Sequence, residues 1–301
     1  MTNKKIVLCI PHGGLNDTLC QIEFCRQYAI KFDRTLYLDT RKSGLLGDFS
    51  IFFKMLDSVG IQHISCSSDI DFAQLNKLSA FPSVLDGRLD SYDSYYSPTI
   101  RKIVERISDT PVTFDMDSEY AEDVLVHQQP GGGSKSFALL SHLTFSAPIK
   151  EEIRNRLAVL PEKYSAVHVR NTDYKSDYVS FFEDIKESVS GSNLLICSDD
   201  AEVIDYAKNY FINSKVFSIT TTTLRDQKPL HRASAYKDDN MRILATLNAL
   251  TDLIALAKSE TLHFPKIGKL SASGESTLGT SGFSRLAEYL FLNKNLINSL
   301  M

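Results

Sequence analysis

Apolar residues along this chain occur in short continuous runs that alternate with longer periodic stretches. Residues 5–10 form a continuous apolar run, which predicts a buried strand that ends at a glycine-containing turn. Residues 15–32 carry apolar side chains at three- and four-residue spacing, which predicts a helix, and residues 34–39 predict the next strand. A strand, a turn, a helix and a second strand in this order indicate a βαβ unit with a right-handed crossover.

The pattern between this unit and the middle of the chain is weaker. It predicts a helix at 52–59, a strand at 61–65 and another strand at 123–128. Pro130 and the three glycines after it mark a loop. Two helical stretches then follow, at residues 137–143 and 148–160.

The second half returns to a regular alternation of strands and helices. Because this spacing is typical of parallel sheets with crossover helices, we expect a second parallel α/β domain. We therefore predict an N-terminal domain over residues 1–145 and a C-terminal domain over residues 146–301. The predicted strands of the second half are 166–169, 194–197, 215–219 and 261–264, and the predicted helices are 178–189, 201–210, 240–257 and a last one that opens at 281–285, with a short terminal helix at 293–301.

Composition narrows the class of protein. The 301 residues are 43% hydrophobic and 23% charged, which is ordinary for a globular protein in water. A formal net charge of -4 argues against a nucleic-acid binder that relies on a basic face. No apolar run is long enough to span a bilayer, and the start does not match a signal peptide. Five cysteines without CxxC spacing favour reduced thiols, so we expect a cytoplasmic protein, with peripheral contact at the inner face of a membrane left open.

The strand that ends at Val169 carries the most conspicuous chemistry. His168, Arg170 and Asp173 lie together where this short buried strand gives way to a polar turn. Ligands of open α/β sheets bind at the carboxyl ends of the strands, and a planar, permanently charged Arg suits bidentate binding of phosphate or carboxylate. An ordinary strand end with a surface ion pair is the alternative interpretation.

Two further segments are predicted to reach the same edge. Ser198, Asp199 and Asp200 end the next strand, where a carboxylate could accept from ribose hydroxyls or a guanine edge, or could cap the following helix. Ser281, Gly282, Phe283 and Ser284 open the last long helix. Free backbone N–H groups and the helix dipole at such a start bind phosphate, although Ser also serves simply as a helix cap.

The glycine turn after the first strand is the remaining candidate. Gly13 and Gly14 could let a ligand approach the backbone closely, or could only allow a tight turn, and Asn16 or Asp17 could cap the helix. The turn is not GxGxxG, so a dinucleotide site is poorly supported.

The polar middle segment carries two patterns that invite a functional interpretation. Tyr92, Tyr95 and Tyr96 fall in a loop-like run, where they could stack on a sugar acceptor or pack on the core. Asp-x-Asp triplets at 69–71 and 115–117 resemble a metal-binding motif, but neither follows an apolar strand, and such triplets arise often by chance. We expect no metal.

Taken together, these segments resemble the fucosyltransferases. His168-Val169-Arg170-Asn171-Thr172-Asp173 is similar to the HxRxxD signature of the α1,6-, nodulation, α1,2- and protein-O-fucosyltransferases. Segments that include 13–19, 34–39, 41–44 and 49–53 in the first half, and 198–201, 251–257 and 281–287 in the second, follow in the order of that family. Asn16-Asp17 departs from the Gly-Asn order of the α1,2 enzymes, so the pattern does not specify the acceptor linkage.

The resemblance implies two facing Rossmann-like domains of the GT-B glycosyltransferase type. The N-terminal domain would form the acceptor side, and the C-terminal domain would bind GDP-fucose as the donor substrate without a metal or another cofactor. Arg170 occupies the place of the family arginine that contacts the diphosphate. His168 and Asp173 would orient it or contact the donor, and the helix start at Ser281–Ser284 would complete the phosphate site.

The implied reaction is inverting transfer of fucose to a glycan, such as a bacterial surface polysaccharide. Inversion requires a general base for the acceptor hydroxyl. Asp177, just after the motif, is the first candidate and Asp17 in the glycine turn is the second. A transferase that uses another sugar nucleotide and a non-catalytic nucleotide- or glycan-binding protein remain the alternatives. The oligomeric state is not predicted.

Overall fold

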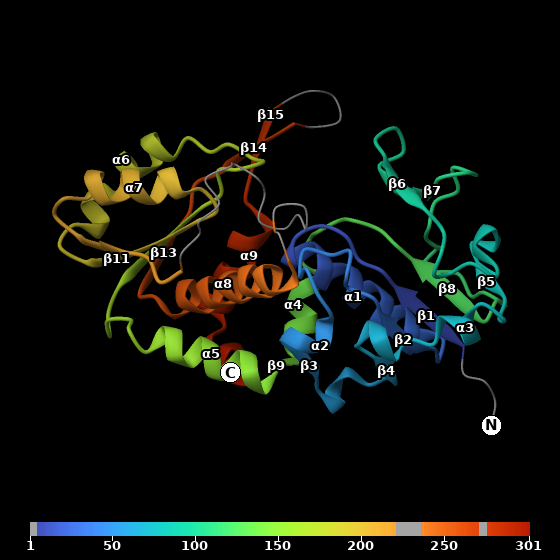
Figure 1. The fold of residues 1–301 in the computed structure, drawn as a ribbon. Coiled ribbons are helices and arrows are strands. Elements are labelled where there is room, and N and C mark those ends of the chain that lie inside the picture. The colour runs from blue at the N-terminus through green and yellow to red at the C-terminus, as the bar shows by residue number, and fades with distance from the viewer. Residues whose placement is uncertain (1–4, 221–235, 237, 271–275) are drawn as a thin grey trace. The chain divides into compact units, whose positions relative to one another are not determined.

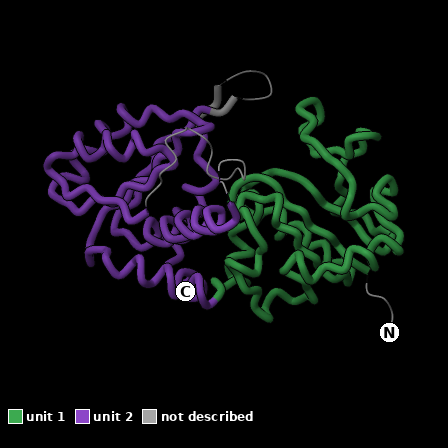
Figure 2. The backbone as a smooth tube through the Cα atoms, in the orientation of Figure 1, with its two compact units in different colours: residues 1–146 green, residues 147–301 purple. Residues whose placement is uncertain are grey.

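The protein divides into two compact units, Met1–Ser146 and Ala147–Met301 (Figure 2). The computed structural model describes residues 5–220, 236, 238–270 and 276–301. Each unit contains a parallel sheet with helices, so the predicted α/β class with parallel sheets is confirmed.

The sheet of the first unit has five strands in the order β4-β2-β1-β8-β5, all paired in parallel (Figure 1). Helix α1, Leu15–Lys31, connects β1 to β2, which confirms the predicted βαβ unit. The predicted strands at 5–10, 34–39, 61–65 and 123–128 are present with shorter bounds. The five strands are β1 Ile6–Cys9, β2 Thr35–Leu38, β4 His63–Ile64, β5 Ala80–Phe81 and β8 Val124–His127.

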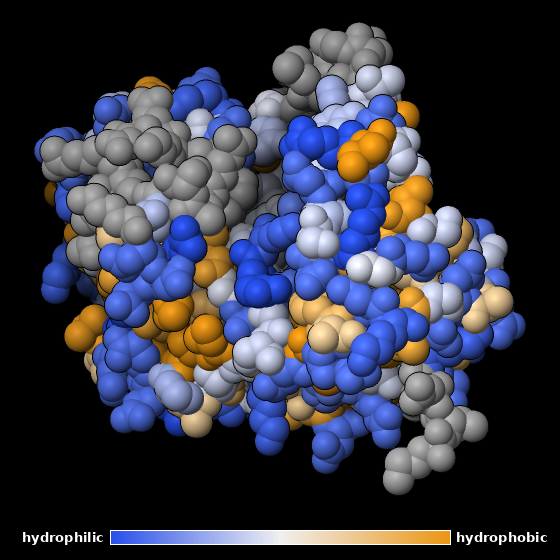
Figure 3. Space-filling view, turned by 45° about the vertical axis from the view of Figure 1, so that its right-hand side comes forward, coloured by the Kyte–Doolittle hydropathy of each residue, from blue (hydrophilic) through white to orange (hydrophobic). Residues whose placement is uncertain are grey.

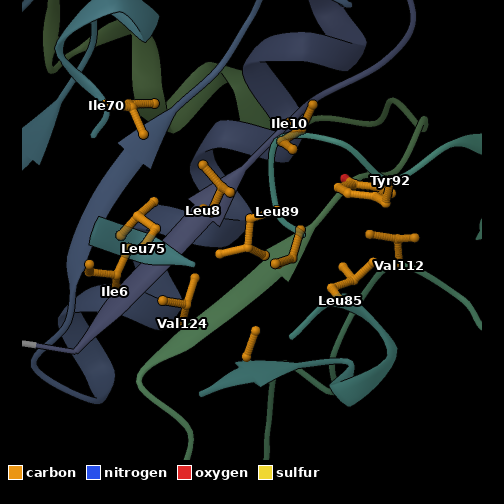
Figure 4. Packing of buried hydrophobic residues seen from close by; sticks show 12 residues of the cluster. Ile6, Leu8, Ile10, Ile70, Leu75, Leu85, Leu89, Tyr92, Val112 and Val124 are labelled. Atoms are coloured by element: carbon orange, nitrogen blue, oxygen red, sulfur yellow. The ribbon is translucent and has the colours of Figure 1, made fainter. Parts of the chain in front are cut away.

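The hydrophobic core of this unit lies between the sheet and the short elements that pack on it. Ile6 and Leu8 of β1 and Val124 of β8 are buried beside Leu75 and Leu89 (Figure 4). The covering elements are short: α2 Phe49–Phe52, β3 Phe53–Met55, α3 Phe72–Leu75, β6 Ser94–Ser97, β7 Lys102–Glu105, α4 Lys135–Leu140, β9 Leu143–Phe145 and the 3-10 turns η1 Asp57–Val59, η2 Ser67–Asp69 and η3 Ser83–Leu85.

One predicted helix of this unit is wrong, and another is present with different bounds. The predicted helix at 52–59 ends at Phe52, because Phe53–Met55 pairs in antiparallel register with Leu143–Phe145. That pairing also ends the predicted helix at 137–143 early. The Phe53 ring lies 5.1 Å from that of Phe49 and 5.4 Å from that of Phe145, so the apolar run is used for strand packing.

The tyrosines of the middle segment lie in a strand or in the core and not in the predicted loop-like run. Tyr95 and Tyr96 belong to strand β6, which pairs with β7 in a hairpin. Tyr92 is 8% exposed and packs in the core of the unit, as the alternative interpretation stated.

The second unit has a four-stranded parallel sheet in the order β12-β11-β10-β13. Its core is built by Val167 and Val169 of β10, Ile196 of β11 and Phe182 of α6. The bounds follow the predicted alternation closely. The strands are β10 Ser165–Val169, β11 Asn193–Ser198, β12 Lys215–Phe217 and β13 Thr261–His263, and the helices are α5 Ala147–Leu157, α6 Tyr178–Val189, α7 Ala201–Tyr210, α8 Asp239–Lys258, α9 Gly282–Leu292 and α10 Lys294–Leu300, with an unpredicted hairpin of β14 Ile267–Leu270 and β15 Ser276–Gly279.

Surface and thiol chemistry agree with the composition. Hydrophilic residues cover most of the visible described surface, with hydrophobic residues in separate groups between them (Figure 3). Of the helices in the described ranges, none combines the length and apolar character needed to cross a membrane. All five cysteines are free thiols, and four of them are buried.

Candidate active site

The site begins at the carboxyl end of β10, an inner strand of the second unit. All five residues of β10 are buried, and the strand pairs with β11 on one side and β13 on the other. The register sets His168 opposite Cys197 and Val169 opposite Ser198. Because parallel strands end at the same edge, the polar turns after β10 and β11 meet there.

His168 joins this strand end to the start of α9. Its Nδ1 lies 2.7 Å from Oγ of Ser284, and its ring centroid lies 4.9 Å from that of Phe283. Burial, and secondarily the charge of Arg170, lowers the pKa of His168 to about 3. The imidazole is therefore neutral at pH 7 and holds the helix start against the strand.

The start of α9 has the features of an anion site. The Ser281 side chain caps the helix by accepting from the backbone N–H of Ser284 at 3.0 Å, as the capping interpretation predicted. Among the described residues, the backbone N–H groups of Gly282 and Phe283 have no protein acceptor. First-turn N–H groups of this kind, together with the helix dipole, attract anions.

Arg170 follows His168 by two residues and is held in place from two sides. Its Nε and Nη2 donate to the two carboxylate oxygens of Asp173 at 3.0 and 2.8 Å. The guanidinium carbon lies 5.5 Å from the ring centroid of Tyr174. In the described part of the chain Nη1 has no protein acceptor, so one edge of the guanidinium remains able to bind an anion.

Asp199 and Asp200 shape the turn that carries Arg170. Asp199 accepts from the backbone N–H of Asn171 at 2.7 Å and from the Thr172 hydroxyl at 2.6 Å. Asp200 accepts from the Asn171 side chain at 2.8 Å and caps α7 through the N–H of Glu202 at 3.0 Å. Burial raises the pKa of Asp199, although its two hydrogen bonds oppose that rise.

Ser198 supports the same turn, because its hydroxyl accepts from the backbone N–H of Asp200 at 3.1 Å. The three residues predicted at this strand end therefore have protein partners. Their contact with a donor stays a prediction.

The first candidate base, Asp177, is the cap of helix α6. Its carboxylate accepts from the backbone N–H of Ser180 at 3.1 Å, and the residue is exposed. It lies at the end of the motif turn, seven residues after Arg170 in the sequence. Nothing in these contacts prevents it from acting as a base, and its role stays a prediction.

The second candidate base, Asp17, belongs to the glycine turn of the first unit. Its Oδ2 accepts from the backbone N–H of Gly14 at 3.1 Å. A Cβ added at Gly13 would lie 2.6 Å from that same oxygen, and one added at Gly132 would collide with Oδ1. The packing of Asp17 therefore accounts for Gly13 and Gly132, and the close approach of a ligand at this turn stays a prediction.

Asn16 completes this arrangement through contacts with the protein, and a ligand contact there stays a prediction. It is 5% exposed, donates to the carbonyl of Gly133 at 3.2 Å and accepts from the Ser136 hydroxyl at 2.7 Å. The glycine turn and the loop after β8 are tied together through α1.

Sequence reasoning missed one buried acid in the second unit. Both oxygens of Asp252, on α8, lie 2.9 Å from the Thr220 hydroxyl, and the Cys197 thiol is a further hydrogen-bond partner. Burial raises the pKa of Asp252 to about 7. An acid within the uninterrupted buried stretch 250–257 was the signal available in the sequence.

Similarity to known proteins is detected at the level of structure. No protein-family model matches the chain, and no curated protein matches its sequence. The NodZ α-1,6-fucosyltransferase co-crystallised with GDP superposes with a TM-score of 0.60 at 18% identity, over 95% of this chain and 92% of that one. Fucosyltransferase NodZ from Bradyrhizobium gives the same TM-score and coverage at 19% identity.

A structure of lower sequence identity shares the fold. POFUT1 in complex with GDP superposes with a TM-score of 0.52 at 13% identity, over 95% of each chain. The resemblance to fucosyltransferases is thus confirmed at the level of the fold. The chain has a fucosyltransferase-like fold of the GT-B type.

Proposed function

We propose that this protein is a metal-independent, inverting glycosyltransferase that transfers fucose from GDP-fucose to a glycan. The observation that carries the proposal is the meeting of the Arg170 guanidinium and the start of α9 at one strand edge of a fucosyltransferase-like fold. Structures of the NodZ fucosyltransferase and of POFUT1 were determined with GDP or GDP-fucose. Both groups at this edge suit a diphosphate.

Arg170 acts on the leaving group. As the bond between fucose and the diphosphate breaks, negative charge grows on the diphosphate oxygens. A fixed guanidinium stabilises that charge more in the transition state than in the ground state, which accelerates the reaction. A charge-assisted hydrogen bond of this kind contributes about 1.5–3 kcal/mol.

Asp173 and His168 hold the anion-binding groups in position. The bidentate pair with Asp173 holds the guanidinium in one orientation, with Nη1 left for the donor. His168, bonded to Ser284, keeps the free N–H groups of Gly282 and Phe283 near the same strand end. The donor phosphates would therefore meet an arrangement that needs little reorganisation.

Asp252 is our candidate for recognition of the base. Thr220 and Cys197 supply one hydrogen each, and a carboxylate has about four acceptor sites, so Asp252 keeps acceptor capacity. Guanine presents two parallel N–H donors on one edge, which a carboxylate matches. Asp199 and Asp200, the acids predicted for this contact, also accept two hydrogen bonds each from the protein and are the alternative.

Acceptor activation is assigned to Asp177. Asp177 is exposed beside the motif turn, whereas Asp17 is enclosed by the glycine packing of its own turn. An Asp177→Asn variant keeps an acceptor for the Ser180 N–H and loses the base. We expect it to bind donor normally and to transfer slowly.

Calorimetry against GDP, UDP, CDP and CMP tests the donor assignment. We expect GDP to bind most tightly, and inosine diphosphate, which lacks the guanine amino group, to bind more weakly. Because two N–H donors favour the ionised form of a carboxylate with a pKa near 7, binding of GDP should release protons from Asp252. A preference for another nucleotide would overturn the fucose assignment.

A further inference from the structure

A second group of polar side chains lies at the ligand edge of the first unit's sheet. His12 follows β1, Lys42 follows β2 and Gln128 follows β8, and these three strands are neighbours. The backbone N–H of His12 donates to the carbonyl of Gln129 at 3.1 Å, which fixes the turn to the β8 side. This group is distinct from the residues assigned to the donor.

Hydrogen bonds determine which ring nitrogen of His12 carries the proton. The Tyr92 hydroxyl donates to Oε1 of Gln128 at 2.7 Å, and the Gln128 amide nitrogen lies 3.0 Å from Nε2 of His12. Reversing the amide would leave the buried Tyr92 hydroxyl without an acceptor, which is unfavourable. Nε2 therefore accepts, and the proton is on Nδ1.

The free Nδ1–H of His12 is accompanied by the Lys42 ammonium. The carboxylate of Asp93, with which Lys42 interacts electrostatically, is itself paired with Arg106. Among the described residues, Nδ1 has no hydrogen-bond partner and Lys42 forms no ion pair. The Lys42 ammonium lies 5.8 Å from the Tyr92 ring centroid. Its charge, after burial, helps to lower the pKa of His12 to about 4. Arg41, in contrast, is paired with Asp39 at 2.7 Å.

We propose that His12 and Lys42 bind an oxyanion on the acceptor sugar, either a carboxylate or a phosphate monoester. A neutral imidazole N–H and an ammonium are both donors, and together they match an anion rather than a neutral hydroxyl. The carboxylate nearest in sequence, Asp39, is already neutralised by Arg41. The inference rests on the proposed function, because it takes the ligand to be the acceptor.

Nuclear magnetic resonance of ¹⁵N-histidine-labelled protein tests this site without requiring turnover. D-glucuronate, glucose 6-phosphate and neutral D-glucose are the probes. A His12→Gln variant assigns the signal. We expect one or both acidic sugars to shift the His12 ring signals and to raise its pKa, because a bound anion favours the imidazolium. Which one binds separates a carboxylate from a phosphate.

The Lys42→Gln variant tests the contribution of the ammonium. Its control is Lys77→Gln, at another exposed lysine of the same unit. We expect Lys42→Gln to weaken binding of the acidic sugar about fivefold, in the range of exposed charge pairs, and to raise the pKa of His12. The Lys77 variant should change neither. An equal response to glucose, no response to any sugar, or unchanged binding in Lys42→Gln would overturn the proposal.

This result can be separated from the donor assignment. Failure of GDP to bind, with acidic sugars still bound at His12, would contradict the proposed function and leave an anionic-sugar site. Tight GDP binding with no sugar bound at His12 would contradict only the inference.

Discussion

At the residue scale, the two arginines Arg34 and Arg170 have different roles. Arg34 is 1% exposed and donates to backbone carbonyls of Tyr120 and Glu122, which ties β2 to the segment before β8. Arg170 is partly exposed and keeps a free edge. A fully buried guanidinium that donates only to main-chain carbonyls indicates a structural group, even though its Nε has no partner among the described residues, whereas a partly exposed group at a strand end indicates a binding role.

Asp252 provides a prediction at this scale. Its folded pKa of about 7 lies above the ordinary value of 3.8, so its contribution to stability is complete below about pH 4 and is lost as the pH rises through 7. This difference corresponds to at most about 4 kcal/mol. We expect Asp252→Asn to flatten that part of the pH profile and to increase the free energy of unfolding at pH 8.

Urea unfolding of both proteins at pH 4, 6 and 8 measures this effect. A profile that stays the same in Asp252→Asn would show that the carboxyl titrates normally in the folded protein.

At the scale of elements, the glycine turn is organised around one side chain of α1. Gly13 has a φ of +96°, and an added Cβ would also meet Asp17. Gly191 has a φ of +74° with open space around it. Replacing Gly191 therefore tests backbone strain alone, whereas replacing Gly13 tests strain together with a collision with Asp17.

We expect Gly191→Ala to cost about 1–2 kcal/mol, the usual penalty of a left-handed residue. Gly13→Ala should cost more, because Asp17 must move and gives up its hydrogen bond to Gly14. Chemical denaturation of the two variants checks the order. If both lose the same stability, the contact with Asp17 is unimportant.

Prediction from sequence succeeded where the apolar periodicity of a helix and the residue that caps it gave the same bounds. Helices α6 and α7 have the predicted bounds, because their apolar periodicity and the caps Asp177 and Asp200 agree. The predicted helix at 52–59 failed, because short apolar runs do not distinguish a helix from a strand and the partner strand is far away in sequence.

The candidate site was predictable in outline and not in its contacts. The grouping of His168, Arg170 and Asp173 at a strand end follows from local sequence. The bond between His168 and Ser284 joins residues 116 positions apart, and Asp252 becomes notable only once burial is known. Contacts set by tertiary packing have no local signature.

At the scale of the whole molecule, buried imidazoles make the fold sensitive to acid. Burial lowers the pKa of His12 and His127 to about 4 and that of His168 to about 3. Depressed pKa values contribute stability that is present above the ordinary pKa of 6.5 and is lost as the pH falls through 4. Asp252 changes in the opposite sense between about pH 4 and 7, and this single group offsets only part of the loss from the three histidines.

We therefore expect the midpoint of thermal unfolding to fall as the pH is lowered from about 6.5 to 4, and the unfolding transition to be accompanied by net proton uptake in that range. Calorimetric scans in buffers between pH 3 and 7 measure it. A midpoint that is constant across this range would mean that these histidines are charged in the folded state.

In the proposed reaction Arg170 drives departure of the donor diphosphate, and turnover of GDP-fucose with a panel of glycan acceptors tests this role. Arg242→Ala is the matched control, since Arg242 and Asp239 form another Arg–Asp pair three residues apart in the same unit. We predict that Arg170→Ala loses nearly all transfer with an unchanged unfolding midpoint, whereas Arg242→Ala keeps it. Substantial transfer by a folded Arg170→Ala protein would contradict the account.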